Sequence, residues 1–123
     1  MMPPAPDRDP ASLLPLTPAM FHVLVALADE PRHGYAIIKD VSTRTDGKVA
    51  LGTGTLYGIV KRLLADGLVV ESRTRPPARN DDERRRYYRL TPFGKQVLAA
   101  ETARLEAMVS AARATQMFRK ARV

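Results

Sequence analysis

The chain of 123 residues contains no cysteine, no tryptophan and only two histidines. The absence of cysteine excludes thiol catalysis, disulfide bonds and every zinc site with cysteine ligands. His22 and His33 stand eleven residues apart without clustered carboxylates, so we expect no metal site and interpret each histidine as a core or helix-cap residue. No metal or other cofactor is expected from this composition.

Long apolar runs are also absent. The longest nearly apolar stretch, residues 20–28, includes His22 and is far too short to cross a bilayer. After Met1-Met2 the chain continues with mostly Pro and Asp rather than with the basic start and apolar run of a secretory signal. We therefore expect a cytoplasmic protein that forms one domain and does not associate with a membrane.

The sequence offers little for catalysis. It lacks a nucleophile elbow, a phosphate-binding glycine loop and a histidine paired with an acid at catalytic spacing. The segment Gly52-Thr53-Gly54 lacks both the further glycine of such a loop and a long strand before it. We therefore predict that the protein is not an enzyme and assign no catalytic residues.

Acidic residues are scarce relative to basic ones: 13 Asp and Glu stand against 20 Lys and Arg, which gives a net charge of +7. The excess is regional, because residues 1–31 hold one base and four acids while residues 32–89 hold thirteen bases and seven acids. Six arginines fall within fourteen residues: Arg73, Arg75, Arg79, Arg84, Arg85 and Arg86. This distribution indicates a polyanionic partner, although a solvated hairpin rich in arginine through codon bias would show it too.

Helical signals dominate the first half of the chain. Residues 1–16 are rich in proline and show no periodicity, which predicts a disordered tail. Thr17 before Pro18 is a capping pair that opens a mostly buried helix over about 18–28. Apolar spacing predicts a second helix over about 34–44, then a turn at 46–47 and a short extended piece at 49–51.

The next segment changes period. Thr53 or Thr55 can cap a third helix that ends at Gly67 in a left-handed conformation. From Leu68 the period becomes two, and this strand can pair with residues 85–90 across a loop over 76–84. Thr91-Pro92 repeats the capping pair and opens a long alanine-rich helix through about residue 115.

This order predicts a mostly α fold with a two-stranded β-hairpin, a winged helix-turn-helix with a long C-terminal helix. We place the DNA-binding domain at 17–91, the C-terminal dimerisation helix at 92–118 and a basic tail at 119–123. In a winged helix, the third helix enters the major groove and the hairpin lies along the DNA backbone. The predicted DNA-binding residues are Tyr35, Thr53, Thr55, Tyr57, Lys61, Arg62, Arg73, Arg75, Arg85 and Arg86.

Two aromatic residues have more than one interpretation. Tyr35 fits a half-buried helix residue as well as a DNA contact, because a tyrosine body packs while its hydroxyl reaches water or phosphate. Tyr57 stands at the start of the predicted recognition helix, which favours a DNA contact. In the strand predicted over 85–90, the side chain of Tyr88 points to the face opposite to Tyr87 and Arg89. This predicts that Tyr88 lies in the core and has no role in DNA binding.

Several short blocks at these positions resemble the PadR family of bacterial transcriptional regulators. The resemblance covers residues 17–95, most of the folded chain. The blocks that carry it are His33-Gly34-Tyr35 with Ile37-Ile38, Gly54-Thr55-Leu56-Tyr57, Lys61-Arg62-Leu63 to Asp66-Gly67-Leu68-Val69, and Arg86-Tyr87-Tyr88-Arg89-Leu90-Thr91 with Gly94. The resemblance implies a homodimeric repressor of an operator in double-stranded DNA. Its C-terminal helix would complete the dimer, and such regulators often release DNA when a small aromatic or lipophilic compound binds.

The chain departs from the family pattern at two places. Gly58 stands where the family usually has proline, inside the recognition helix. The acidic run Asp81-Asp82-Glu83 at the hairpin tip would repel a phosphate backbone, so a DNA contact of the tip does not follow from the resemblance. The strand arginines on either side of the tip are unaffected by this departure.

The final helix carries Leu98, Leu105, Met108 and Ala112 at heptad-like spacing, interrupted by Glu101. This pattern predicts a homodimer, and a helix folded back on its own core is the alternative. The resemblance suggests a small-molecule effector, which would bind between the two protomers, where the first and final helices meet. Its candidate lining is Phe21, Leu24, Val25, Leu105, Met108 and Val109, which also fit plain core positions.

A winged-helix module for protein or RNA contact is the alternative function, because a fold does not fix a function.

Overall fold

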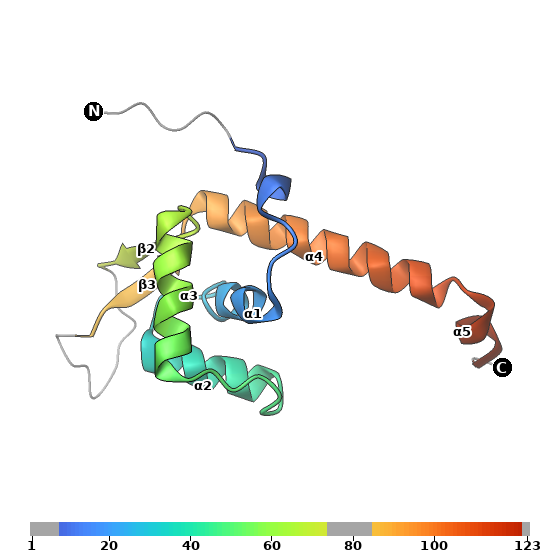
Figure 1. The fold of residues 1–123 in the computed structure, drawn as a ribbon, viewed down its shortest axis with the longest axis horizontal. Coiled ribbons are helices and arrows are strands. Elements are labelled where there is room, and N and C mark those ends of the chain that lie inside the picture. Colours follow the sequence, from blue (N-terminus) through green and yellow to red (C-terminus); the bar gives the residue numbers. More distant parts are fainter. Residues whose placement is uncertain (1–7, 74–84, 122–123) are drawn as a thin grey trace.

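The computed structural model describes residues 8–73 and 85–121. In chain order the elements are η1 (Pro10–Leu13), α1 (Pro18–Ala26), β1 (Arg32–His33), α2 (Gly34–Arg44), α3 (Thr53–Ala65), β2 (Val69–Ser72), β3 (Tyr87–Leu90), α4 (Pro92–Arg113) and α5 (Gln116–Ala121). Figure 1 shows α1, α2, α3 and the strands gathered near the start of α4, which then leads away from them. The predicted fold class, a mostly helical winged helix with a long C-terminal helix, is confirmed.

The starts of α1 and α4 follow the predicted capping chemistry. The Thr17 hydroxyl accepts a hydrogen bond from the backbone N–H of Met20 at 3.1 Å, and the Thr91 hydroxyl accepts one from Gly94 at 2.9 Å. The prediction that Thr53 or Thr55 caps α3 is wrong. The cap is Gly52, and no side chain of the described residues caps this helix. Thr53 is already the first helical residue, so its hydroxyl no longer lies in front of the free N–H groups.

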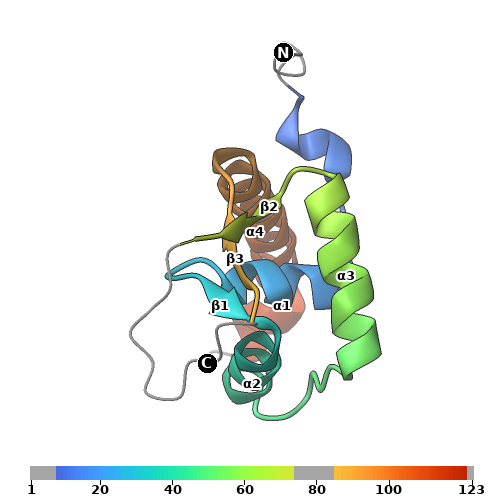
Figure 2. The same cartoon turned by 90° about the vertical axis from the view of Figure 1, so that its left-hand side faces the viewer.

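The sheet has three antiparallel strands in the order β1-β3-β2, one more than predicted. Figure 2 shows β3 between its two neighbours. In register, Tyr87 of β3 lies opposite both His33 of β1 and Ser72 of β2. Two-residue β1 is too short to show a period in the sequence, which is why it was missed. Residues 49–51, predicted as extended, join no strand of the described chain.

The core lies where the three helices of the winged helix meet the strands and the start of α4. Tyr88 belongs to this core, as predicted, at 6% exposure, and so does Leu90 at 5%. Tyr87 is also buried, because its ring packs edge-on against the His33 ring at 5.2 Å. The buried hydrophobic residues that form the cluster are Leu16, Val23, Leu24, Ala26, Leu27, Ile37, Val41, Leu56, Val60, Leu63, Leu68, Val69, Tyr88, Leu90 and Val97.

The folded part begins earlier than the predicted boundary at residue 17. Residues 10–13 form η1, and Leu16 is buried at 8% exposure. The backbone N–H of Leu16 donates a hydrogen bond of 2.7 Å to Glu101 on α4. Arg8 donates to the carbonyl of Asp66 and lies 4.4 Å from the Phe93 ring centroid. Contacts with residues far along the chain therefore fix residues 8–16, and local periodicity cannot reveal such contacts.

A close contact fixes the start of α4 against the turn between α3 and β2. Leu68 accepts a 3.0 Å hydrogen bond from the backbone N–H of Thr91, whose hydroxyl donates to the carbonyl of Gly67 at 2.6 Å. A Cβ at Gly94 would lie 2.0 Å from the Leu68 carbonyl oxygen, so only glycine fits there. Gly67 closes α3 at a φ of +76°, as predicted. This contact sets the wing at a fixed position beside α3.

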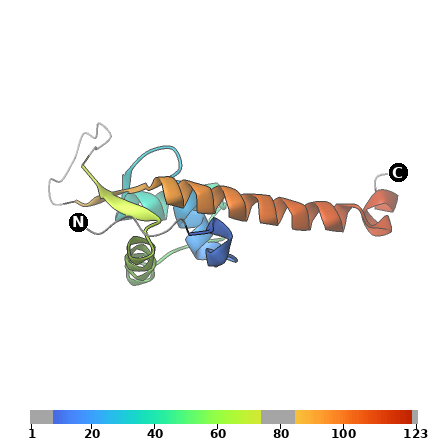
Figure 3. The same cartoon turned by 90° about the horizontal axis from the view of Figure 1, so that it is seen from above.

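Helix α4 ends at Arg113, and α5 follows after a short break, whereas the sequence predicted one helix over 92–118. Figure 3 shows the later part of α4 extending beyond the winged helix. Met108 and Val109 in this part are 58% and 52% exposed. Within the described ranges, no helix has both the length and the apolar character that a membrane crossing requires.

Candidate nucleic-acid interface

Helix α3 has one buried and one exposed face. Leu56, Val60 and Leu63 face the core with at most 2% exposure. The five predicted DNA-binding residues of this helix are all exposed: Thr53, Thr55, Tyr57, Lys61 and Arg62. Packing of the apolar stripe therefore turns these hydroxyl and basic side chains outward together.

The wing carries three more of the predicted residues. Arg73 directly follows β2, Arg85 and Arg86 directly precede β3, and all three are exposed. Because Ser72 pairs with Tyr87, the two ends that carry these arginines lie next to each other. The predicted site residue Arg75 lies outside the described residues, as do Arg79, Arg84 and the acidic run 81–83.

Ion pairs divide the basic residues into two groups. Arg32 pairs with Glu30 at 3.5 Å and with Asp40 at 3.4 Å, and Arg44 pairs with Asp40 at 2.7 Å. Arg32 and Arg44 therefore stabilise the fold through ion pairs within the chain. Lys61, Arg73 and Arg86 form no ion pair with any described residue, and Arg62 has only a 3.8 Å pair with Asp66. The second group lies on α3 and the wing, where its charge is available to an external anion.

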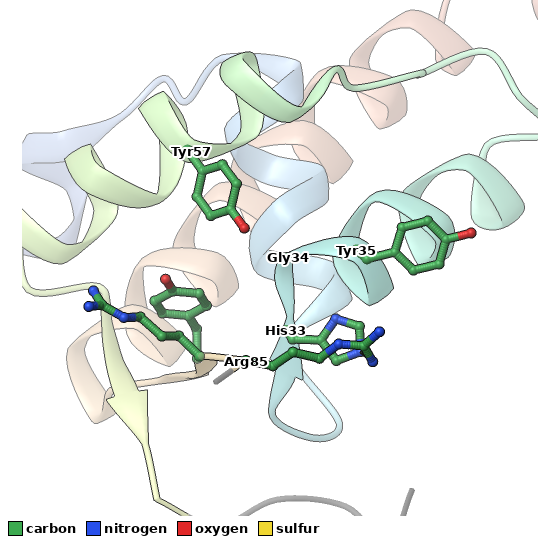
Figure 4. A pocket seen from close by; sticks show the side chains of 7 residues that line it. His33, Gly34, Tyr35, Tyr57 and Arg85 are labelled. Carbon is green, nitrogen blue, oxygen red and sulfur yellow. Dashed lines mark hydrogen bonds between the residues drawn. The ribbon is translucent and has the colours of Figure 1, made fainter. Parts of the chain in front are cut away.

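A pocket of about 490 Å³ opens between α2, α3 and the wing (Figure 4). It brings together four of the predicted residues: Tyr35, Tyr57, Arg85 and Arg86. The remaining lining residues are His33, Gly34 and Tyr88. The prediction had assigned these four residues to DNA contact without indicating that they share a cavity.

The two exposed tyrosines play different parts in this pocket. In Figure 4 the Tyr57 hydroxyl points towards the start of α2, whereas Tyr35 points away from Tyr57. A Cβ at Gly34 would lie 3.1 Å from the Tyr57 hydroxyl, so this glycine leaves room for the phenol. Tyr35 is 67% exposed and stacks on His33 at 6.5 Å between ring centroids. It therefore forms the outer rim.

His33 caps the start of α2, which is one of the two roles, core or cap, predicted for it. Its Nδ1 accepts a hydrogen bond from the backbone N–H of Ala36 at 3.3 Å, and its Nε2 lies 3.2 Å from Nη1 of Arg85. His22 packs edge-on against Phe21 at 5.7 Å. No three metal-ligating side chains come together in residues 8–73 and 85–121.

Tyr88 adds a group that sequence reasoning missed. Its body belongs to the core, yet it also lines the pocket. Burial raises the pKa of Tyr88, and the neighbouring Tyr57 raises it further. The hydroxyl therefore stays protonated at neutral pH and can donate a hydrogen bond. The alternating pattern identifies the buried side of β3 but not the cavity that the end of this side chain reaches.

A second, mostly apolar groove of about 410 Å³ lies between α1 and α4. Its lining is Phe21, Thr102, Leu105, Glu106, Val109, Ser110 and Arg113. It includes three of the residues predicted to contact an effector: Phe21, Leu105 and Val109. Leu24 lies fully buried in the core instead, Val25 is half-buried on α1, and Met108 is exposed with its sulfur 3.2 Å from Arg104. The structure thus brings together half of that set.

Comparison with known proteins gives one family. Residues 23–100 match the model of the transcriptional regulator PadR-like family. A transcriptional regulator of Mycobacterium tuberculosis, Rv3488, is 34% identical over 85 residues, which are 69% of this chain and 73% of that protein. An uncharacterized 37.1 kDa protein in transposon Tn4556 of Streptomyces fradiae is 41% identical over 83 residues, 68% of this chain. The match spans 21% of that longer protein.

Solved structures share the fold. A transcriptional regulator from Clostridium thermocellum has a TM-score of 0.62 at 25% identity, over 76% of this chain and 85% of that chain. PadR of Bacillus subtilis in complex with operator DNA has a TM-score of 0.54 at 21% identity, over 67% of this chain and 45% of that one. The second likeness concerns the fold alone.

Proposed function

The chain belongs to the PadR-like family of transcriptional regulators, and we propose that it acts as a repressor that binds double-stranded operator DNA as a homodimer. The observation that carries this proposal is the exposed face of α3 beside basic wing residues that form no ion pair with another described residue. Lys61 on α3 and Arg73 and Arg86 on the wing supply this charge. Uncompensated positive charge at a winged helix is the electrostatic footprint of a nucleic-acid-binding protein.

The chemistry of α3 suits groove reading. In this motif the N-terminal part of the recognition helix contacts base edges, and here it carries Thr53, Thr55 and Tyr57. Lys61 and Arg62 follow one turn later, where long basic side chains reach phosphates. The wing arginines then contact the backbone beside the groove. The family is one of regulators, so this proposal includes no catalytic step.

The later part of α4 supports the dimer. Leu105 is half-buried, Met108 and Val109 are more than half exposed, and this part of the helix extends beyond the winged helix (Figure 3). Helices in proteins gain most of their stability from packing one face against another element. A second copy of the chain would supply that face, and its two-fold symmetry would present two α3 helices to one duplex.

An effector, if one acts on this protein, would bind in the groove between α1 and α4. Its apolar lining by Phe21, Leu105 and Val109 suits a small aromatic or lipophilic compound. Binding releases DNA only when the compound has different affinities for the two dimer geometries. A tenfold change in operator affinity requires about 1.4 kcal/mol of difference.

A direct binding comparison tests the proposed function. A duplex with dyad symmetry, selected from a random library, should bind more tightly than single-stranded RNA of the same length. Tighter binding to the RNA, or no retained duplex after selection, would contradict the proposal and favour an RNA or protein interaction module.

A further inference from the structure

Two tyrosine hydroxyls line the pocket between α2, α3 and the wing. Tyr88 is 94% buried, being 6% exposed, and Tyr57 reaches the pocket from α3. Neither hydroxyl forms a hydrogen bond with another described residue, and no buried side-chain oxygen of the described residues lacks a partner, so both hydroxyls are accessible from the pocket. Each can therefore donate a hydrogen bond to a ligand that enters the pocket.

The charge of the pocket identifies the chemical class of that ligand. Arg85 and Arg86 contribute two guanidinium groups, and among the described residues no Asp or Glu lines the cavity. The first turn of α2, at Gly34 and Tyr35, also lines it, and helix N-termini carry partial positive charge. Hydroxyl donors, guanidinium groups and a helix N-terminus together favour an oxyanion.

The surroundings indicate where this oxyanion comes from. Tyr57 lies on the same exposed face of α3 as Thr53 and Lys61, so a group held by Tyr57 lies beside whatever α3 contacts. The rim of the pocket, Tyr35 and Arg86, is exposed as well. A phosphate that remains part of a polymer can thus enter from the side of the recognition helix.

We propose that the pocket binds one phosphodiester group of the DNA backbone in each half-site, held by the hydroxyls of Tyr57 and Tyr88 and by Arg86. This inference rests on the proposed function. The bound phosphate fixes the position of α3 along the groove. It does so because the pocket is lined by both α3, through Tyr57, and the start of α2, at Gly34. Such contacts set the register of a recognition helix and carry no sequence information themselves.

The test uses the duplex selected for the binding comparison, with each backbone phosphate replaced in turn by an uncharged methylphosphonate. For the wild-type protein we expect one position in each half-site where this replacement weakens binding by about tenfold or more. At that position Tyr57→Phe should lose less further affinity than at any other, because the replacement has already removed the charge and one of the two oxygens that can accept the Tyr57 hydrogen bond. At all other positions the two proteins should respond alike.

The unmodified duplex gives a second readout. Tyr57→Phe and Tyr88→Phe should each weaken binding by about tenfold, equivalent to about 1.4 kcal/mol, without changing the salt dependence, since a hydroxyl carries no charge. Arg86→Gln should weaken binding and reduce the salt slope by about one. Tyr87→Phe is the matched control: it removes a hydroxyl from the preceding residue of β3, which is outside the pocket lining, and should leave affinity unchanged.

Folding is checked by thermal unfolding of each variant, and Tyr57, which is 51% exposed, provides the variant least sensitive to folding. The inference would be overturned, while the proposed function stands, if the protein binds the duplex but Tyr57→Phe responds like wild type to methylphosphonate at every position. Binding of inorganic phosphate in the pocket, together with that uniform response, would assign the site to a free anion and also overturn it. Absence of duplex binding would overturn both.

Discussion

The two halves of α4 lie in different environments although they form one continuous helix. The first half buries Gly94, Val97 and Glu101 against the winged helix. In the second half, every residue from 106 to 113 is exposed, including Met108 and Val109. Figure 3 shows the second half extending beyond the winged helix. The first half thus belongs to the fold of one chain, and the second half has the character of an assembly surface.

The contacts of the first half explain its dependence on the rest of the chain. Gly94 fits against the carbonyl of Leu68, and Glu101 accepts the N–H of Leu16. Both contacts join segments distant in sequence. The second half has an apolar groove beside Phe21 and no comparable buried polar contact within residues 8–73 and 85–121. Substitutions in the two halves should therefore affect different properties, folding in one and dimerisation in the other.

Gly94→Ala should give the largest effect. The added Cβ would lie 2.0 Å from the Leu68 carbonyl oxygen, a backbone atom that cannot move without displacing the wing. We expect the free energy of unfolding to fall by about 3 kcal/mol or more. Urea unfolding followed by circular dichroism measures it.

Gly58→Ala is the matched control, because it makes the same change at a helical glycine whose added Cβ meets nothing within 4 Å. It should raise the free energy of unfolding by up to about 1 kcal/mol, through helix propensity. Equal effects of the two substitutions would refute the tight contact at Gly94.

Val109→Asn should act on assembly. Val109 is 52% exposed on a single chain, and each dimer would bury two copies of it. Replacing both should raise the dimer dissociation constant by about thirtyfold, near 2 kcal/mol, while each winged helix stays folded. Sedimentation equilibrium measures this constant. A wild-type mass equal to one chain at micromolar concentration would refute the dimer.

Glu101→Gln tests the contact between the first half of α4 and residue 16. The Glu101 carboxylate is buried and accepts hydrogen bonds from the Leu16 N–H and from Arg104. Its replacement by a neutral amide should lower the free energy of unfolding by about 1–2 kcal/mol at pH 7. Glu106→Gln, on the exposed side of the same helix, should change stability by less than about 0.5 kcal/mol.

The effect of Glu101→Gln on the free energy of unfolding should depend on pH. Hydrogen bonding from Arg104, aided by the Leu16 N–H and opposed by burial, holds the pKa of Glu101 below its ordinary value of 4.5. The stabilisation is therefore complete above about pH 4.5 and is lost as the pH falls through the lower folded pKa. The stability difference between wild type and Glu101→Gln should shrink on acidification. A constant difference from pH 7 to pH 3 would contradict this assignment.

Local patterns predicted most of the fold. Helix α2 has the predicted bounds of 34–44, because its apolar spacing is regular and a histidine and a glycine stand at its start. Strand β1, the early start of the folded part and the contact at Gly94 were not predicted. Each depends on residues brought together from far along the chain, and such contacts leave no period in the sequence.

The candidate site was predicted in part for the same reason. Charge and helix position identified Tyr57, Lys61 and the wing arginines. They could not show that Tyr88 reaches the same pocket, because that requires β3 to lie beside α2 and α3. Nor could composition separate the arginines that serve internal ion pairs, such as Arg32, from Arg86 on the wing.

In the proposed dimer, the second half of α4 joins two winged helices whose α3 faces and wings bind one duplex. The most direct test is the affinity for a duplex with two half-sites about ten base pairs apart, measured over a range of salt concentrations. If each protomer neutralises about three to five phosphates, the plot of log K against log salt should have a slope of about −5 to −9. A slope near zero would contradict the account.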